Sequence, residues 1–277
     1  MGVKIVTDSS ADLPEKVAKD LDISIVPLYV RFGEQVYRDR IDISEDEFYH
    51  RLTRDTIHPS TIQPSPQDFS NVYKNLAKEA EGIVSIHISN KLSGTCNSAL
   101  QAKEGITQCP VEVIDSQVLS SALGLVVISA ARLARDSAKI PEIVKHVNDI
   151  LPTVYLLGLL DTLKYLVLGG RIGKAKQLLG SLLNVKPVLT LKNGEVMPAG
   201  QVRSRSKGID RLFEFVKSAN SVQDLSIAYN TTFDEAQALA ERFAAAKIFD
   251  LDKIIMARIG PMLGVHMGPG TIIVAYR

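Results

Sequence analysis

The chain has no tryptophan, only two cysteines and no excess of charge of one sign. Cys96 and Cys109 cannot build a disulfide framework, and neither stands in a CxxC or Cys/His spacing typical of a metal site. The 32 basic and 31 acidic residues are interspersed, so no basic stripe points to nucleic acid or an anionic membrane. The sequence therefore predicts a cytoplasmic protein with no metal and no nucleic-acid partner.

Long hydrophobic runs are also scarce. Residues 118–131 carry no charge, and residues 154–168 are interrupted by Asp161 and Lys164. Both stretches are shorter than the roughly 20 apolar residues that a membrane-spanning helix needs, and no signal peptide precedes the first predicted strand. We expect no transmembrane segment. Residues 118–134 instead predict a buried helix, whose small side chains suit either close packing or one wall of a cavity.

The length and the pattern of elements predict two domains. A chain of 277 residues exceeds what one hydrophobic core usually supports, although a single large α/β domain is the alternative. Strands alternate with helices before Pro152, which predicts a parallel sheet. Beyond it, Asn193-Gly194 predicts a hairpin. The predicted fold is α/β, with an N-terminal parallel-sheet α/β domain (1–151) and a C-terminal α+β domain with a mixed sheet (152–277).

One stretch combines a strand, a polar loop and a helix start. Residues 83–88 are rich in isoleucine and valine, as in a buried strand, and Ser93-Gly94-Thr95 follows where a helix should begin. Free N–H groups at a helix N-terminus, with hydroxyls beside them, attract a carboxylate or a phosphate. The alternative is that Ser93 merely caps the helix over residues 95–103.

Further hydroxyl and carboxyl groups follow predicted strands. Asp8 and Ser9 end the first strand, where open α/β sheets bind ligands, although both residues also suit a turn cap. Residues 58–66 contain three prolines and predict a stiff extended segment. Within it Ser65 caps the next helix. Thr61 has no such local role and is the better candidate for a ligand contact.

Two glycine-rich segments of the C-terminal half carry basic residues. Residues 264–270 predict an irregular exposed loop around His266, which is either a binding residue or a structural histidine. Gly169-Gly170-Arg171 precedes a predicted helix over residues 174–183, and this turn suits an anion, although it is not a Walker A motif.

Seven short motifs together carry a resemblance that extends along the whole chain. They are VTDSSADLP (6–14), ST (60–61) before QPSP (63–66), LSGT (92–95), IDS (114–116), GGRI (169–172), KP (186–187) and GVHMGPG (264–270). In this order and spacing the chain resembles the DegV family of bacterial fatty-acid-binding proteins, whose members include the lipid-binding subunit of fatty acid kinase.

The resemblance implies that the two domains close over one long-chain fatty acid. Its carboxylate would lie at Thr61 and Ser93, with the backbone of Gly94 and Thr95 and the side chain of His266 nearby. Its tail would run along the helix that follows residue 118, and the expected tail residues are Ser121, Leu125 and Ile128.

The resemblance also implies a partner. A separate ATP-binding subunit would phosphorylate the bound acid to an acyl phosphate for phospholipid synthesis, and this chain, which has no nucleotide motif, would be its non-catalytic substrate-binding subunit with no cofactor besides the acid. Arg171, Arg203 and Arg205 are the expected contacts to the phosphate or the partner, with Arg171 first because it lies in a matching motif. Transient contact with a membrane is compatible with this role.

Two other functions compete with this one. A stand-alone lipid carrier or sensor would use the same pocket without a kinase. A hydrolase or acyltransferase would use Ser93 as nucleophile and His266 as base, but Ser93 is not in a G-x-S-x-G elbow and no motif supplies the orienting acid.

Overall fold

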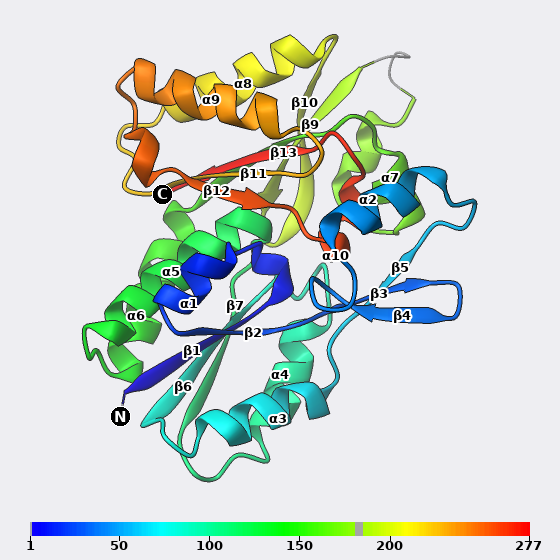
Figure 1. The fold of residues 1–277 in the computed structure, drawn as a ribbon. Helices are drawn as coiled ribbons and strands as arrows, with labels where there is room; N and C mark the ends of the chain where they lie inside the picture. The colour runs from blue at the N-terminus through cyan, green and yellow to red at the C-terminus, as the bar shows by residue number, and fades with distance from the viewer. Residues whose placement is uncertain (1, 181–184) are drawn as a thin grey trace.

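The structure is a computed structural model that describes residues 2–180 and 185–277. Within these ranges the strands form a parallel four-stranded sheet (β2-β1-β6-β7), a mixed six-stranded sheet (β10-β9-β8-β13-β11-β12) and an antiparallel three-stranded sheet (β4-β3-β5) (Figure 1). The strands are β1 (Val3–Asp8), β2 (Ile23–Val26), β3 (Tyr29–Phe32), β4 (Gln35–Arg38), β5 (Ser60–Ile62), β6 (Gly82–His87), β7 (Val111–Asp115), β8 (Tyr155–Leu159), β9 (Lys186–Lys192), β10 (Glu195–Val202), β11 (Leu225–Tyr229), β12 (Ile255–Arg258) and β13 (Ile272–Tyr276).

Most helices lie on the faces of the two larger sheets, whereas Glu45–Arg54 and Lys164–Leu168 pack against Pro261–Met267. The helices are α1 (Glu15–Asp20), α2 (Glu45–Arg54), α3 (Pro66–Leu76), α4 (Thr95–Lys103), α5 (Ser120–Arg135), α6 (Ile140–Ile150), α7 (Lys164–Leu168), α8 (Arg205–Lys217), α9 (Phe233–Ala245) and α10 (Pro261–Met267), with short 3-10 turns at Ser9–Ala11, Leu151–Thr153, Gly173–Leu178 and Leu251–Lys253. Among the helices described, none is long and apolar enough to cross a bilayer.

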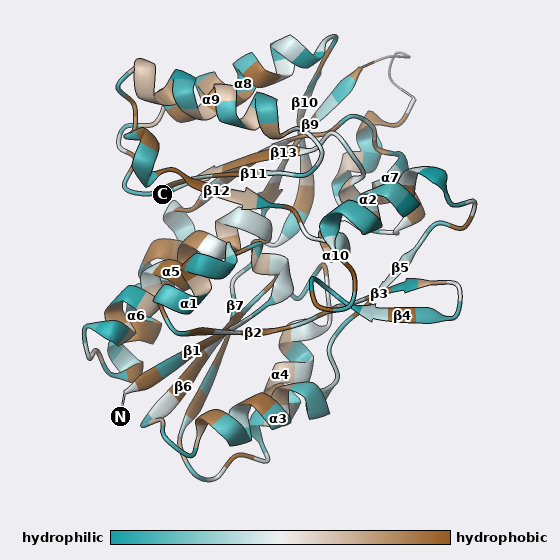
Figure 2. Ribbon diagram, viewed as in Figure 1, coloured by the Kyte–Doolittle hydropathy of each residue, from teal (hydrophilic) through white to brown (hydrophobic). Residues whose placement is uncertain are grey.

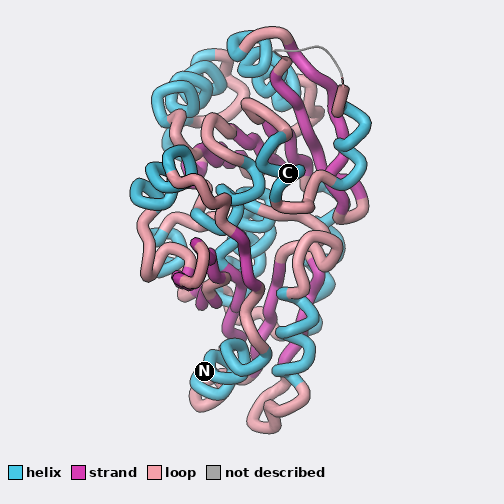
Figure 3. The backbone as a smooth tube through the Cα atoms, turned by 90° about the vertical axis from the view of Figure 1, so that its right-hand side faces the viewer, coloured by secondary structure: helices cyan, strands magenta, loops and turns pink. Residues whose placement is uncertain are grey.

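This architecture confirms the predicted fold class. The parallel sheet ends in sequence with β7, and the strands of the mixed sheet begin with β8. The domain bounds 1–151 and 152–277 remain a prediction. The view in Figure 3 separates the strands into one group near the N-terminus and a second group above it.

Helix α5 lies between the two larger sheets. It contacts β1 and β6 of the parallel sheet and β11 and β13 of the mixed sheet, and every residue from Ser120 to Ala131 is buried. Figure 2 shows hydrophobic colour concentrated on this helix and on the strands around it. A Cβ on Gly124 would lie 2.9 Å from the carbonyl oxygen of Ala11, so this glycine permits close packing. A helix that is apolar on all sides is stable because it has apolar partners on both sides.

The helix cap predicted at Ser65 is present in the structure. Ser65 caps α3 by accepting from the N–H of Asp68, whose carboxylate accepts from the N–H of Ser65 in return. Pro27 separates β2 from β3, and these strands belong to different sheets.

Two predicted elements need correction. The exposed loop predicted around His266 is wrong: Pro261–Met267 is helix α10, and all its residues are buried. A Cβ on Gly264 would lie 2.5 Å from Cε1 of Phe48, so this glycine serves close helix packing. In the predicted helix over residues 174–183, Gly173–Leu178 forms a 3-10 turn, and residues 181–183 lie outside the described part of the chain.

A buried charged cluster fastens the start of α10. Nη2 of Arg40 lies 2.9 Å from Oδ1 of Asp12, which also accepts from the N–H of Gly260 at 2.8 Å. Asp39 accepts from the N–H of Met262 at 3.2 Å. Burial raises the pKa of Asp12 to about 7 and that of Asp39 to about 6, although the charge of Arg40 opposes both shifts.

The raised pKa of Asp12 predicts that acidification strengthens the fold at this cluster. Between its unfolded pKa of about 4 and its folded pKa of about 7, only the folded protein holds the proton, so Asp12 adds to the free energy of unfolding as the pH falls. Asn cannot titrate. The stability advantage of the wild type over Asp12→Asn should grow by on the order of 2 kcal/mol from pH 8 to pH 5 in urea unfolding.

The control is Thr107→Ala, which changes an exposed side chain that has no titratable group. Its stability difference from the wild type should be the same at both pH values. An advantage over Asp12→Asn that does not change with pH would contradict a raised pKa at Asp12.

Candidate functional site

A cavity lies beside the N-terminal end of α5, between the two larger sheets. It holds about 930 Å³ of empty space, including its opening to solvent. Most of its lining is apolar: Leu28, Ile88, Leu92, Leu119, Leu156, Gly158, Leu160, Leu166, Leu189, Leu191, Val196, Met262, Leu263, Met267 and Ile273. The polar lining residues are Thr61, Gln63, Ser93, Arg171, Thr190 and His266. A cavity of this composition suits an elongated apolar ligand with one polar end.

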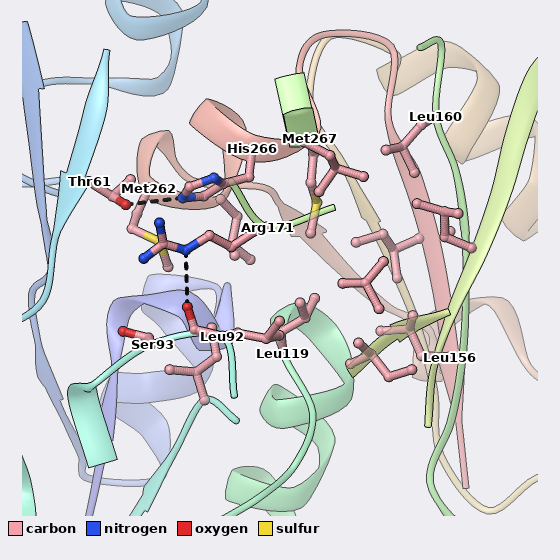
Figure 4. Close-up of a pocket in the computed structure, with 18 of the residues that line it drawn as sticks. Thr61, Leu92, Ser93, Leu119, Leu156, Leu160, Arg171, Met262, His266 and Met267 are labelled. Carbon is pink, nitrogen blue, oxygen red and sulfur yellow. Dashed lines mark hydrogen bonds between the residues drawn. The ribbon is translucent and has the colours of Figure 1, made fainter. Parts of the chain in front are cut away.

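The polar residues gather mainly at one end. Figure 4 shows Thr61, Ser93, Arg171 and His266 on one side of the cavity, and Leu156 and Leu160 on the other. Oγ1 of Thr61 lies 3.0 Å from Nε2 of His266, which joins β5 to α10. The structure thus brings together four residues that are far apart in the sequence.

The loop before α4 presents Ser93. The N–H groups of Leu92 and Ser93 both bond to the carbonyl oxygen of Ser89, which curls the loop. The N-cap of α4 is Gly94, and Oγ of Ser93 accepts from the N–H of Thr95 at 3.3 Å. Ser93 therefore precedes the N-cap, and its hydroxyl sits at the N-terminus of the helix, where the dipole favours a negative charge.

His266 is buried and neutral at pH 7. Burial lowers its pKa to about 4, and the electrostatic interactions with Arg171 and His58 act in the same direction. Gly169 makes room for the ring, because a Cβ there would lie 2.1 Å from Nδ1. With the ring proton on Nε2, His266 donates to Oγ1 of Thr61 and leaves the hydroxyl hydrogen of Thr61 for another acceptor. Nδ1 of His266 has no hydrogen-bond partner among the described residues.

Arg171 joins the glycine-rich turn to the loop before α4. Its Nη1 donates to the carbonyl oxygen of Gly169 at 3.0 Å, and its Nε donates to that of Leu92 at 3.3 Å. The side chain is exposed at the mouth of the cavity.

A second, basic cleft adjoins this mouth. It is lined by Asn90, Lys91, Leu92, Ser93, Gly94, Gly170, Arg171, Gly173, Lys174, Lys176, Glu195 and Val196, so Leu92, Ser93, Arg171 and Val196 are shared with the cavity. Nζ of Lys174 lies 3.0 Å from Oε2 of Glu195, and Lys91 lies 4.0 Å from Oε1. Four cations against one carboxylate leave this cleft positive, so it suits an anionic group close to the polar end of the cavity.

Other predicted site residues lie elsewhere. Arg203 is exposed and does not line the cavity. Arg205 pairs with Glu235 at 2.7 Å and donates to the carbonyl oxygen of Gly270, so its guanidinium is occupied within the C-terminal half. Thr95 is buried behind Ser93, and Oγ of Ser93 lies 2.8 Å from its Oγ1.

The expected tail residues do not line this cavity. Ser121, Leu125 and Ile128 face Ala11 to Pro14 and the strands β11 and β12, where the packing leaves no comparable space. The reason is the position of α5 between the two sheets: its contribution to the cavity wall is Leu119, which precedes its first turn.

Two contributions to the site were not predicted from the sequence: the side chain of Gln63, and the space that Gly169 leaves for the ring of His266. The carboxamide of Gln63 donates to Oγ of Ser98 at 3.1 Å and packs on Gly94, where a Cβ would lie 2.1 Å from its Oε1. Both residues stand inside motifs that carried the family resemblance, so those motifs were the available signal.

A buried hydrogen-bonded chain involves Asp8. Oδ2 of Asp8 lies 2.9 Å from Nδ1 of His87, whose Nε2 lies 2.7 Å from Oγ of Ser85. All three side chains are fully buried and line none of the cavities described above, so this acid, imidazole and hydroxyl have no access to a substrate. Asp8 also accepts from the N–H of Ser10 and caps the turn that follows, as one of its two predicted roles required.

The geometry gives little support to a hydrolase. Nε2 of His266 bonds to Thr61, and Oγ of Ser93 bonds to Thr95, so no nucleophile and base pair is formed at this site in the described structure. The described residues also contain no group of three or more His, Cys, Asp or Glu side chains placed to hold a metal.

Known proteins resemble this chain along its whole length. The family model described as "Uncharacterised protein, DegV family" matches residues 2–277. A DegV domain-containing protein of Deinococcus radiodurans is 36% identical over 278 residues, which cover 99% of this chain and 98% of the relative.

Two solved structures are similar over the full length. A DegV family protein from Thermus thermophilus, described by its fatty acid binding, has a TM-score of 0.92 and 34% identity, covering 100% of this chain and 99% of that one. A stearic acid-binding protein from Eubacterium ventriosum has a TM-score of 0.89 and 28% identity, covering 99% of this chain and 98% of that one.

The buried setting of His266 predicts an unusual titration. In the ligand-free protein, its NMR titration should have a midpoint at about pH 4, because burial and the nearby Arg171 disfavour the imidazolium. In Arg171→Ala the midpoint should move upward. A midpoint at the ordinary value of about 6.5 in the wild type would mean that the ring is accessible to water.

Proposed function

The chain belongs to the DegV family, and on this premise we propose that it binds one long-chain fatty acid in the cavity between the domains formed by residues 1–151 and 152–277. The proposal includes a second step: the bound acid is presented to a separate ATP-dependent kinase subunit, which converts its carboxylate to an acyl phosphate. Relatives of closely similar fold are described as binding fatty acids, one of them stearic acid.

The observation that carries the proposal is that apolar side chains line most of the cavity and polar groups line one end of it. A long wall of leucine, isoleucine and methionine side chains leads to one small group of hydroxyl, imidazole and guanidinium groups. Burying an acyl chain contributes about 0.8 kcal/mol per methylene, so a long chain gains on the order of 10 kcal/mol before ordering costs. An amphiphile with one charged end fits this arrangement.

The carboxylate would be held by groups at the polar end. A buried carboxylate needs hydrogen-bond donors. The hydroxyl groups of Thr61 and Ser93 are available for this role, supported by the backbone of Gly94 and Thr95 at the N-terminus of α4. Neutral His266 orients Thr61 through its ring nitrogen. When the anionic ligand is bound, its charge would raise the pKa of His266 and favour a closer pairing.

The basic cleft supports presentation to a kinase. It shares Ser93 and Arg171 with the cavity, so a phosphoryl donor in the cleft would lie next to the carboxylate. In the proposed role Arg171 stabilises the negative charge that builds up during transfer. Arg203 is exposed and available to a partner, whereas Arg205 is engaged in its ion pairs. A lipid carrier or sensor would use the same cavity without this transfer.

Removing the proposed carboxylate donors should release the ligand. Thr61→Ala with Ser93→Ala deletes two hydrogen bonds to a charged group, each worth about 1.5–3 kcal/mol, so affinity should fall at least about a hundredfold. Mass spectrometry of organic extracts should find a near-stoichiometric C14 to C18 acid in the wild type and little in the variant. Thr107→Ala with Ser221→Ala, both exposed and outside the cavity, is the matched control. Absence of any acyl species from the wild type would refute the proposal.

Replacing Arg171 distinguishes binding of the fatty acid from transfer of the phosphoryl group to it. Loaded wild-type protein, mixed with ATP and the kinase subunit of the same organism, should give an acyl phosphate that hydroxylamine traps as a hydroxamate. Without the kinase no product should form. Arg171→Ala should retain the acid but lose about 2 to 4 kcal/mol of transition-state stabilisation, which is a loss of roughly 30- to 1,000-fold in rate.

The control for this experiment is Arg211→Ala, an exposed arginine on α8 that lines neither cleft nor cavity. It should be phosphorylated at the wild-type rate. Undiminished transfer in Arg171→Ala would remove Arg171 from the proposed step, and no transfer in the wild type would favour the carrier or sensor.

A further inference from the structure

The end of the cavity opposite His266 is closed by few residues. Figure 4 shows Leu156 at this end, far from Thr61 and Ser93. Leu156, Thr190 and Leu191 line the cavity and also line a separate groove, here called the outer groove. The other residues of the outer groove are Ser116, Gln117, Val118, Leu151, Pro152, Val154, Tyr155, Lys192, Asn193 and Phe215. A wall that is one residue thick therefore separates the two spaces.

The sheet is not continuously paired at this wall. Strands β8 and β9 are antiparallel, and their register pairs Gly158 with Leu189 and Leu159 with Val188. Both strands continue, to Tyr155 and to Lys192, but within the described residues their register has no pair beyond Gly158.

A side chain takes the place of the missing pairs. Oγ1 of Thr190 donates to the carbonyl oxygen of Leu156 at 2.7 Å. One side-chain hydrogen bond is easier to break than a row of backbone hydrogen bonds, because its loss leaves the rest of the ladder intact. The two strands are therefore held together loosely where the cavity meets the outer groove.

The outer groove has a surface that suits the end of an acyl chain. Leu151, Val154, Tyr155 and Phe215 provide apolar contacts, and Tyr155 is half-exposed. Covering such side chains with a hydrocarbon removes apolar surface from water. No cation other than Lys192 lines the groove among the described residues, so nothing there favours a second charged head group over a hydrocarbon.

We propose that Leu156, Thr190 and Leu191 determine the acyl chain length that this protein accepts, and that the methyl end of a longer acid passes between β8 and β9 into the outer groove. This inference rests on the proposed function. It adds a class of ligand, straight-chain acids longer than the cavity itself, whose polar end stays at Thr61 and Ser93.

The test is a binding series of saturated acids from C14 to C24, measured by competition against a fluorescent fatty acid. The wild type should bind the C20 to C24 acids as well as it binds C18. Leu191→Phe places a larger side chain in the wall, and Leu191 is half-buried, so the added volume can be accommodated. This variant should weaken C20 to C24 at least about tenfold and leave C14 unchanged, since each methylene kept from burial costs about fourfold in affinity.

A second variant should have the opposite effect. Thr190→Val keeps the shape of the side chain and removes the hydrogen bond to Leu156, which must break when the wall opens, so C20 to C24 should bind more tightly than to the wild type. A third, Tyr155→Ser, changes only the outer groove and should weaken C22 and C24 alone. Because Tyr155 is exposed, this variant keeps the test valid if Leu191→Phe does not fold.

The matched control is Leu157→Val, on the same strand as Leu156. Leu157 belongs to the core on the other face of the mixed sheet, with Leu212 and Phe243. Its chain-length profile should equal that of the wild type.

The outcomes separate the two proposals. If no acid of any length binds to the wild type, the proposed function fails. If C14 to C18 bind but C20 to C24 do not, or if all variants share the profile of the wild type, the fatty-acid site stands and the passage between β8 and β9 is refuted.

Discussion

The burial of α5 between two sheets is the constraint on which the site depends. Because this helix is apolar on all sides, both sheets must pack against it, and their positions relative to each other are fixed. Ser89 then bonds to the carbonyl oxygen of Gly194, and Arg171 to that of Leu92, across the two halves of the chain. The cavity is the space that remains beyond the N-terminal end of α5.

The few polar groups that line the cavity lie mainly at one end, so the cavity has one polar end and one apolar end. His266 remains neutral because burial disfavours its charge, and Thr61 occupies one of its ring nitrogens. The charged cluster of Asp12, Asp39 and Arg40 lies outside the cavity and fastens the start of α10, the helix that carries His266. The hydrogen bonds of this cluster therefore position α10 from outside the cavity, while hydroxyl groups, the imidazole and one exposed guanidinium line the cavity.

The two ends of the cavity meet different surfaces. At the polar end it opens beside a basic cleft, and at the apolar end a thin wall separates it from the outer groove. In the proposed function, the carboxylate of the acid would lie beside the basic cleft while its chain stays in the apolar part of the cavity. The carboxylate would then react with a phosphoryl donor in the cleft without release of the chain from the cavity.

Residue types and short spacings were enough to predict the local features: the strands of the parallel sheet, the cap at Ser65, the apolar character of α5, and Thr61, Ser93, Arg171 and His266 as candidates. These features depend on residues that are close together in the sequence. Three other features appear only once the chain is folded: Gly264 packs inside a helix, Leu119 rather than Leu125 reaches the cavity, and Arg205 is held in ion pairs. Each of these depends on which surface of a helix meets a neighbour distant in sequence, and that is set by packing of the whole chain, which no short pattern encodes.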